Sequence, residues 1–240
     1  MKIIANKNNS MKYLRKYEQH AKKKFGQNFI IDPSVVETIA KYSGTGDLVL
    51  AIAPRLGAWT NNVEVILEDF LKTDLSKLEN KSMDVCANLP YYITTPILFK
   101  LMELDVNKMT LMVQKEIGDR LKAKPNTKDY NALSIQIQHY FEVKQVMKVS
   151  RESFHPRPTV ESIVIQLLPK HNEIGYDEAH FFDFVKGCFQ FRRKTISNNL
   201  KAMGYKNITK SLESIGIDPK TRAEALTKDD FLKIYGVFHD

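Results

Sequence analysis

Short apolar runs bounded by turn residues dominate the chain up to residue 170, and helical periodicity replaces them beyond it. The runs predict buried strands at 47–53, 63–67, 83–87, 109–113, 143–149 and 162–168. Apolar positions at helical spacing predict helices between them, after Asp32, near Pro96 and over 115–123. This alternation is typical of an α/β domain, and we expect the last two strands to form an antiparallel end to its sheet.

After Lys170, apolar side chains recur every three to four residues, which predicts helices. One predicted helical face carries Phe181, Val185, Cys188, Ile196, Leu200 and Met203. We therefore expect three parts: a basic N-terminal extension over residues 1–24, an α/β domain over 25–170, and a small all-helical domain over 171–240.

Positive charge gathers in two segments of a chain whose formal net charge is +8. Residues 1–24 contain eight basic residues and one acidic residue, and residues 186–206 contain six basic residues and no acidic one. Two basic segments on a nearly neutral body indicate a polyanionic partner. For residues 1–15, a solvated tail is the alternative.

Cysteine content and hydropathy exclude several classes of protein. Cys86 and Cys188 are the only cysteines, so there is no disulfide framework and no metal-ligand spacing. No apolar run is long enough to span a membrane. We expect a cytoplasmic protein that uses no metal and no membrane.

The stretch with the clearest chemistry is Asn88-Leu89-Pro90-Tyr91, directly after the strand predicted at 83–87. Thr94 or Thr95 is expected to cap a helix that begins at Pro96. The four residues would then lie in a strand-to-helix loop at the carboxyl edge of the sheet, where open α/β sheets bind ligands.

This loop can present two hydrogen-bond acceptors, the Asn88 side-chain oxygen and a backbone carbonyl next to Pro90. Proline restricts its own φ and the conformation of the preceding residue, so that carbonyl can be held rigidly. Two fixed acceptors would orient an exocyclic amine such as adenine N6, and Tyr91 offers a flat surface for a base. A plain Asx-Pro turn that closes the strand is the alternative.

Five further stretches complete a pattern in register: Phe25 to Phe29, Gln114 to Leu121, Ala123 to Tyr130, Phe154-His155-Pro156-Arg157-Pro158, and Arg192-Arg193-Lys194-Thr195. With Asn88 to Tyr91, they resemble the KsgA-type (RsmA) small-subunit rRNA adenine N6,N6-dimethyltransferases, from about residue 20 to the end of the chain. The Erm methyltransferases, which act on the large subunit, are less similar.

The resemblance implies a Rossmann-like S-adenosylmethionine methyltransferase domain followed by a helical domain. It implies a monomer that dimethylates adenine N6 in 16S-type rRNA of a small-subunit precursor, during ribosome biogenesis. Asn88, Leu89 and Pro90 would orient N6, and Tyr91 and Phe154 would sandwich the base. For Phe154, a buried aromatic residue is the alternative.

The resemblance also assigns binding residues. Those expected to contact S-adenosylmethionine are Gln27, Asn28, Ile30, Ala53, Gly57, Asp69 and Asn88. Asp69 would accept a hydrogen bond from the cofactor's adenine amine, with a solvated loop acid as the alternative. The basic residues expected to contact RNA are Lys22, Lys23, Lys24, Arg193, Lys194 and Lys201, whereas Arg192 lies near the apolar face.

The chain departs from the family in its cofactor loop. The family pattern Glu-x-Gly-x-Gly-x-Gly is replaced by Ala51-Ile52-Ala53-Pro54-Arg55-Leu56-Gly57, in which Gly57 is the only glycine. Glycines in this loop let the backbone approach the cofactor, and an arginine side chain there should fill part of its pocket.

The chain is also short after Gly57. Five residues separate it from the strand predicted at 63–67, although a crossover between parallel strands needs about a dozen. The family's intervening helix, strand and ribose-binding acid have no counterpart. An engineered deletion, a naturally shortened homologue, or residues missing between Thr60 and Asn61 would each explain this. The alternative function is therefore a cofactor-deficient homologue, or a deliberately disabled variant, that binds rRNA without catalysis.

Overall fold

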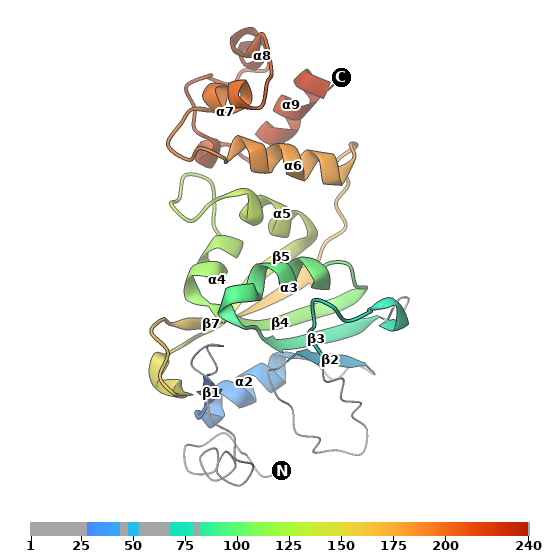
Figure 1. The fold of residues 1–240 in the computed structure, drawn as a ribbon, viewed down its shortest axis with the longest axis vertical. Helices are drawn as coiled ribbons and strands as arrows, with labels where there is room; N and C mark the ends of the chain where they lie inside the picture. The colour runs from blue at the N-terminus through green and yellow to red at the C-terminus, as the bar shows by residue number, and fades with distance from the viewer. Residues whose placement is uncertain (1–27, 44–47, 53–67, 79–81, 240) are drawn as a thin grey trace. The chain divides into compact units, whose positions relative to one another are not determined.

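The computed structural model describes residues 28–43, 48–52, 68–78 and 82–239, and the chain forms two compact units (Figure 1). The first unit runs to Gly118 and includes Val143–Pro169; the second comprises Asp119–Glu142 and Lys170–Asp240. The segment 119–142 thus packs with the C-terminal helices, although the sequence predicted it to belong to the α/β domain over 25–170.

A mixed sheet organises the first unit. In the described part of the chain it has five strands, in the order β2-β3-β4-β7-β5. Their bounds are β2 Val49–Ile52, β3 Met83–Asn88, β4 Val106–Gln114, β5 Phe141–Val149 and β7 Ser162–Pro169. β2, β3 and β4 are parallel, and β7 runs antiparallel to β4. The predicted α/β, Rossmann-like fold with an antiparallel end is confirmed.

The core of this unit forms where the sequence is most continuously apolar. β3 and β4 have helices on both sides, since α2 (Pro33–Ser43) and α3 (Thr94–Leu101) lie on opposite sides of the sheet (Figure 1). Strands covered on both faces are apolar throughout rather than alternating. The fully buried residues of these strands and of α3 include Met83, Val85, Met109, Leu111, Val113, Leu98 and Leu101.

Two local predictions were wrong. The strand predicted at 47–53 is not buried: β2 is the edge of the described sheet, its exposure alternates, and Val49 is 41% exposed. The strand predicted at 63–67 lies outside the described residues. The helix predicted to start at Pro96 starts at Thr94, after a 3₁₀ turn over Tyr91–Ile93, and its N-cap is Ile93.

A two-stranded antiparallel sheet pairs β1 (Phe29–Ile30) with β6 (Phe154–His155). Phe154 lies in a buried cluster with Val35, Met112, Val149 and Val164. This cluster joins the start of the described chain to the end of β4, because Met112 belongs to that strand.

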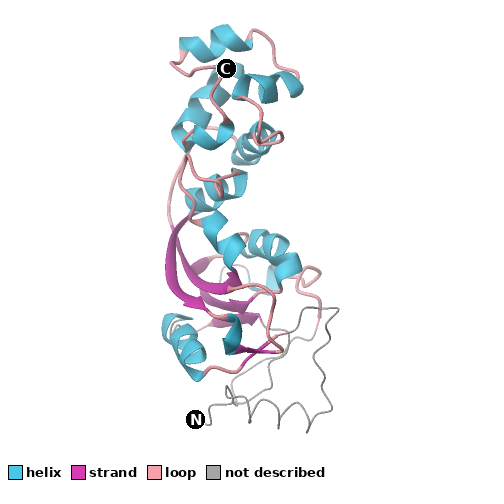
Figure 2. Cartoon of the chain, turned by 90° about the vertical axis from the view of Figure 1, so that its left-hand side faces the viewer, coloured by secondary structure: helices cyan, strands magenta, loops and turns pink. Residues whose placement is uncertain are grey.

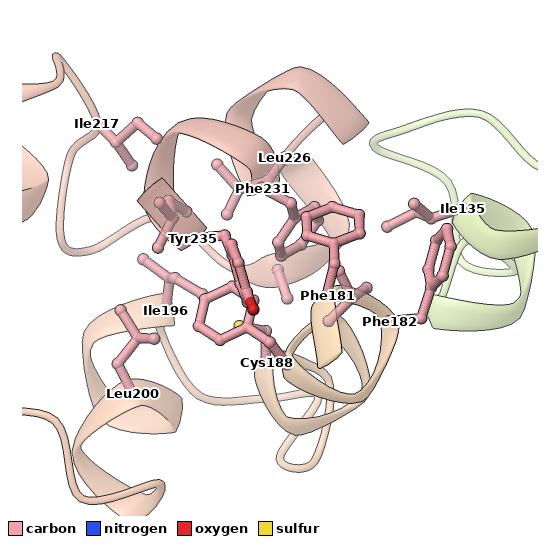
Figure 3. Packing of buried hydrophobic residues seen from close by; sticks show 14 of the residues in the cluster. Ile135, Phe181, Phe182, Cys188, Ile196, Leu200, Ile217, Leu226, Phe231 and Tyr235 are labelled. Carbon is pink, nitrogen blue, oxygen red and sulfur yellow. The ribbon is translucent and has the colours of Figure 1, made fainter. Parts of the chain in front are cut away.

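The second unit consists almost entirely of helices and loops (Figure 2). Its helices are α5 Ala132–Tyr140, α6 Glu178–Cys188, α7 Ile196–Ala202, α8 Ile208–Ser214 and α9 Lys228–His239, and α4 (Lys115–Leu121) leads into it. Figure 3 shows the core, in which Phe181 and Phe182 of α6 lie near Ile135 of α5. All of the predicted apolar face is buried except Met203, which is partly buried.

Hydrogen bonds fasten the basic loop 122–128 and its continuation to the same unit. The Asn126 amide donates to the Glu224 carbonyl at 2.8 Å, and the Tyr130 hydroxyl donates to the Leu226 carbonyl at 3.0 Å. Within the ranges described, no helix is both long and apolar enough to cross a bilayer.

Candidate functional site

The Asn88–Tyr91 loop leaves the sheet at the carboxyl end of β3, as its sequence predicted. Asn88 is the last residue of β3 and is half-buried opposite Met112 of β4. The Leu89 amide donates to the Met112 carbonyl at 3.1 Å, and the Leu89 side chain is buried. The first two residues of the loop are therefore fixed to the central strand.

The turn that follows uses the Pro90 carbonyl. It accepts hydrogen bonds from the Ile93 amide at 3.2 Å and from the Thr94 hydroxyl at 2.9 Å. Thr94 was expected to cap the helix with its side chain; instead it closes the preceding turn. The Pro90 carbonyl is thus engaged, whereas the neighbouring Leu89 carbonyl accepts no hydrogen bond from the described residues and is open to a ligand.

Tyr91 is anchored through its hydroxyl. Its oxygen lies 2.5 Å from the hydroxyl oxygen of Ser162, which is fully buried at the start of β7. Burial raises the pKa of Tyr91, and the hydrogen bond with Ser162 opposes that rise only in part. Tyr91 is thus a neutral phenol whose ring is held beside the loop.

Sequence reasoning missed two residues at this place. Ser162 carries no local signal, because its partner Tyr91 is 71 residues away. Tyr92 follows the recognised stretch directly and is 66% exposed, which places a second aromatic ring at the loop surface. The two adjacent tyrosines in the sequence were the available signal for it.

Phe154 lies under the site rather than on its surface. It is 4% exposed, and it pairs with Ile30 in the β1–β6 ladder. Through Met112, the buried cluster around Phe154 reaches the strand position opposite Asn88. The structure therefore brings Ile30, Phe154 and Asn88 to the same end of β4, with Phe154 in the buried arrangement of the two considered.

The remaining cofactor residues are only partly described. Asn28 is half-buried just before β1. Asp69 is exposed, and its Oδ1 accepts a hydrogen bond from the Leu71 amide at 3.0 Å. Oδ2 of Asp69 accepts no hydrogen bond from the described residues, so it is open to an amine. Gln27, Ala53 and Gly57 lie outside the described residues, as do Lys22, Lys23 and Lys24.

The C-terminal basic residues divide into two kinds. Arg192 lies 3.7 Å from the Glu224 carboxylate and also donates to the Lys128 carbonyl, so it fastens loops within the second unit. Arg193, Lys194 and Lys201 are exposed, and none has a side-chain partner among the described residues. Among the described residues, these three cations of the predicted RNA-binding set remain open to phosphate.

Comparison with known proteins agrees with this arrangement. A family model described as ribosomal RNA adenine dimethylase matches residues 51–240. The ribosomal RNA small subunit methyltransferase A of Bacillus cytotoxicus is 39% identical, and that of Bacillus cereus is 40% identical; each alignment covers 96% of both chains. The first alignment extends over 279 positions, more than the 240 residues of this chain, so the relative contains residues without a counterpart here.

Solved structures share the fold. A dimethyladenosine transferase from Plasmodium falciparum superposes with a TM-score of 0.71 at 23% identity, over 86% of this chain and 95% of that one. The 23S rRNA methyltransferase ErmE gives a TM-score of 0.63 at 20% identity, over 88% of this chain and 100% of that one.

Proposed function

Because this chain belongs to the ribosomal RNA adenine dimethylase family, we propose that it methylates adenine N6 in small-subunit ribosomal RNA. One observation carries the proposal to the level of residues. The loop at the end of β3 is fixed by the Leu89–Met112 bond, and its Pro90 carbonyl is already engaged. The Asn88 side-chain oxygen and the Leu89 carbonyl accept no hydrogen bond from the described residues and are available to a ligand.

Those two acceptors match the two N–H groups of an adenine amine. The amine lone pair is normally delocalised into the ring, and two fixed acceptors would turn it toward the reacting carbon. The anchored ring of Tyr91 would support the base by stacking, after the base has left its helix. Phe154 would act from below, by holding Ile30 and the end of β4 in place.

S-adenosylmethionine would supply the methyl group as an electrophile. Among the described residues, Asn28, Ile30, Asp69 and Asn88 would hold it. Oδ2 of Asp69 is suited to accept from the cofactor's amine, because Oδ1 alone is used by the turn. The described residues therefore fit the cofactor's adenine end.

Replacing Asn88 tests the proposal. Asn88→Ala removes one of the two acceptors and should lower methyl transfer by about a hundredfold or more, as loss of a transition-state hydrogen bond does. Because Asn88 is only half-buried, the unfolding midpoint of the Asn88→Ala variant should stay close to that of the wild-type protein. Asn198→Ala, at an exposed asparagine of α7, is the matched control. Turnover above a tenth of wild type in Asn88→Ala would refute the assigned role.

A second function is favoured by the cofactor loop. Ala51, Ala53 and Arg55 stand where the family has an acid and two glycines, and the relatives contain residues that this chain lacks. A homologue with this loop would bind rRNA or a pre-ribosomal subunit without catalysis. Titration with S-adenosylmethionine by calorimetry separates the two functions, since the second requires no binding.

A further inference from the structure

Phe191 is an exposed aromatic residue in the loop that joins α6 to α7. It is 46% exposed, and its ring contacts no other ring among the described residues. Phe189, two residues earlier, is packed: its ring lies 6.0 Å from Tyr130 and 5.6 Å from Phe231. Single exposed apolar residues are common and need no explanation by themselves. Two further features set Phe191 apart.

The first feature is the rigidity of the backbone that carries it. Asn199 of α7 is buried, and its side-chain oxygen accepts from the Phe191 amide at 2.9 Å. Its amide group also donates to the carbonyls of Thr195, at 3.2 Å, and of Phe191, at 3.4 Å. The Lys194 amide closes a turn onto the Phe191 carbonyl at 2.9 Å. The buried Asn199 side chain thus fixes the loop backbone, while the Phe191 side chain stays exposed and outside the buried cluster of the second unit.

The second feature is the charge around it. Arg193 and Lys194 follow two and three residues after Phe191, past the Glu224-paired Arg192, and Lys201 lies on α7. Arg193, Lys194 and Lys201 are exposed without side-chain partners in the described ranges. Residues 186–206 contain no acidic residue, and among the described residues Glu224 and Asp183 pair with Arg192 and Lys186 rather than with these three cations. An aromatic ring beside several open cations complements a strand that offers both unpaired bases and phosphates.

We propose that the loop 189–195 docks single-stranded RNA, with an unpaired base stacked on Phe191 and phosphates on Arg193 and Lys194. The proposal takes from the proposed function only that the partner is RNA. The new element is a contact in the second unit that binds single-stranded RNA and that shares no residue with the adenine loop of the first unit. A duplex offers phosphates to the same cations but no unstacked base to Phe191.

Binding of short RNAs to the full chain tests this proposal. The probe is a single strand of about twelve nucleotides with a central 2-aminopurine, which is quenched on stacking, beside a duplex of the same sequence. Phe191→Ala should weaken single-strand binding by about fivefold or more at every salt concentration and reduce the quenching. Phe191→Trp should restore both, and duplex binding should change less than twofold in either variant.

Replacing the cations should change the salt dependence of RNA binding, in contrast to replacing Phe191. Arg193 and Lys194 changed together to alanine should flatten the plot of log K against log salt by about 1.4 units on a single strand, about 0.7 for each cation. Phe191→Ala should leave that slope unchanged, because stacking releases no counterions. Wild-type affinity and quenching in Phe191→Ala, or equal losses on strand and duplex, would overturn the proposal. Neither readout needs methyl transfer, so a catalytically inactive protein is tested equally well.

Discussion

At the scale of single residues, two buried polar side chains shape the two surfaces proposed to meet RNA. Ser162 holds the Tyr91 hydroxyl, and Asn199 holds the backbone of Phe191. Neither touches the proposed ligand. Ser162 is hydrogen-bonded to Tyr91 and Asn199 to Phe191, and these partners are proposed to contact RNA. A buried polar group that loses its hydrogen-bond partner costs free energy. Each pair therefore favours one conformation of its own loop.

The Ser162–Tyr91 pair yields a prediction about catalysis. Ser162→Ala removes the anchor of the ring, and kcat/KM for methyl transfer should fall by about three- to tenfold, as expected from the net worth of one hydrogen bond. Tyr91→Phe should cause a similar loss, and the double variant should lose no more than either single one. Additive losses would show that the two hydroxyls act independently.

At the scale of elements, the contact between α4 and β7 leaves no room for a side chain at Gly118. A Cβ at this position would lie under 3.0 Å from two side-chain atoms of Ile163, which is fully buried in β7. α4 therefore approaches the sheet as closely as its backbone allows, next to the Ser162 end of the strand.

We expect Gly118→Ala to destabilise the protein by about 1–3 kcal/mol, although alanine favours helices, because overpacking outweighs propensity. Ile163→Val, which removes a crowding methyl group, should recover part of the loss in the double variant. Urea unfolding measures both. Gly187→Ala is the control, because its Cβ would meet only the flexible side chain of Met203. Equal effects at the two glycines would contradict this account of the α4–β7 contact.

The elements that sequence predicted best are those whose burial is uniform. β3, β4, β7 and the helical face after Lys170 were recognisable because their apolar pattern directly reflects their burial. The edge position of β2 could not be recognised from the sequence, because it depends on which strands lie beside β2 in the sheet. The grouping of 119–142 with the C-terminal helices was not predictable either, because bonds such as Tyr130 to Leu226 join residues 96 positions apart.

The candidate site was predictable only where its residues are neighbours in the sequence. Asn88 to Tyr91 form a continuous stretch whose position after a strand is visible in the sequence. The burial of Phe154 and the anchoring of Tyr91 by Ser162 depend on pairing between distant strands. The sequence could not predict that Phe154 packs beside Met112, because that contact joins segments far apart in the chain.

At the scale of the whole molecule, the two units have separate proposed tasks. The first carries the adenine loop, and the second carries the open cations and Phe191. The part of the chain that departs most from its family, residues 51–57, includes none of the residues assigned to these two surfaces. Changes there should alter cofactor affinity without altering RNA binding.

We therefore expect S-adenosylmethionine to bind at least about tenfold more weakly than to a relative with the full glycine loop, as loss of one charge-assisted hydrogen bond implies. Arg55→Gly should recover part of the difference, because it removes the bulkiest departure in the loop. Calorimetry on protein of confirmed intact mass measures both. Affinity equal to that of the relative would show that the altered loop does not limit binding.

The central claim is that this chain methylates adenine N6 in ribosomal RNA. Its most direct test is mass spectrometry of nucleosides, after incubation of small ribosomal subunits lacking adenine methylation with the protein and millimolar S-adenosylmethionine. The account predicts N6-methylated adenosines, including the dimethylated form, with the wild-type chain, and at least about a hundredfold fewer with Asn88→Ala over the same time. Absence of any methylated adenosine with a wild-type protein that binds the same subunits would contradict it.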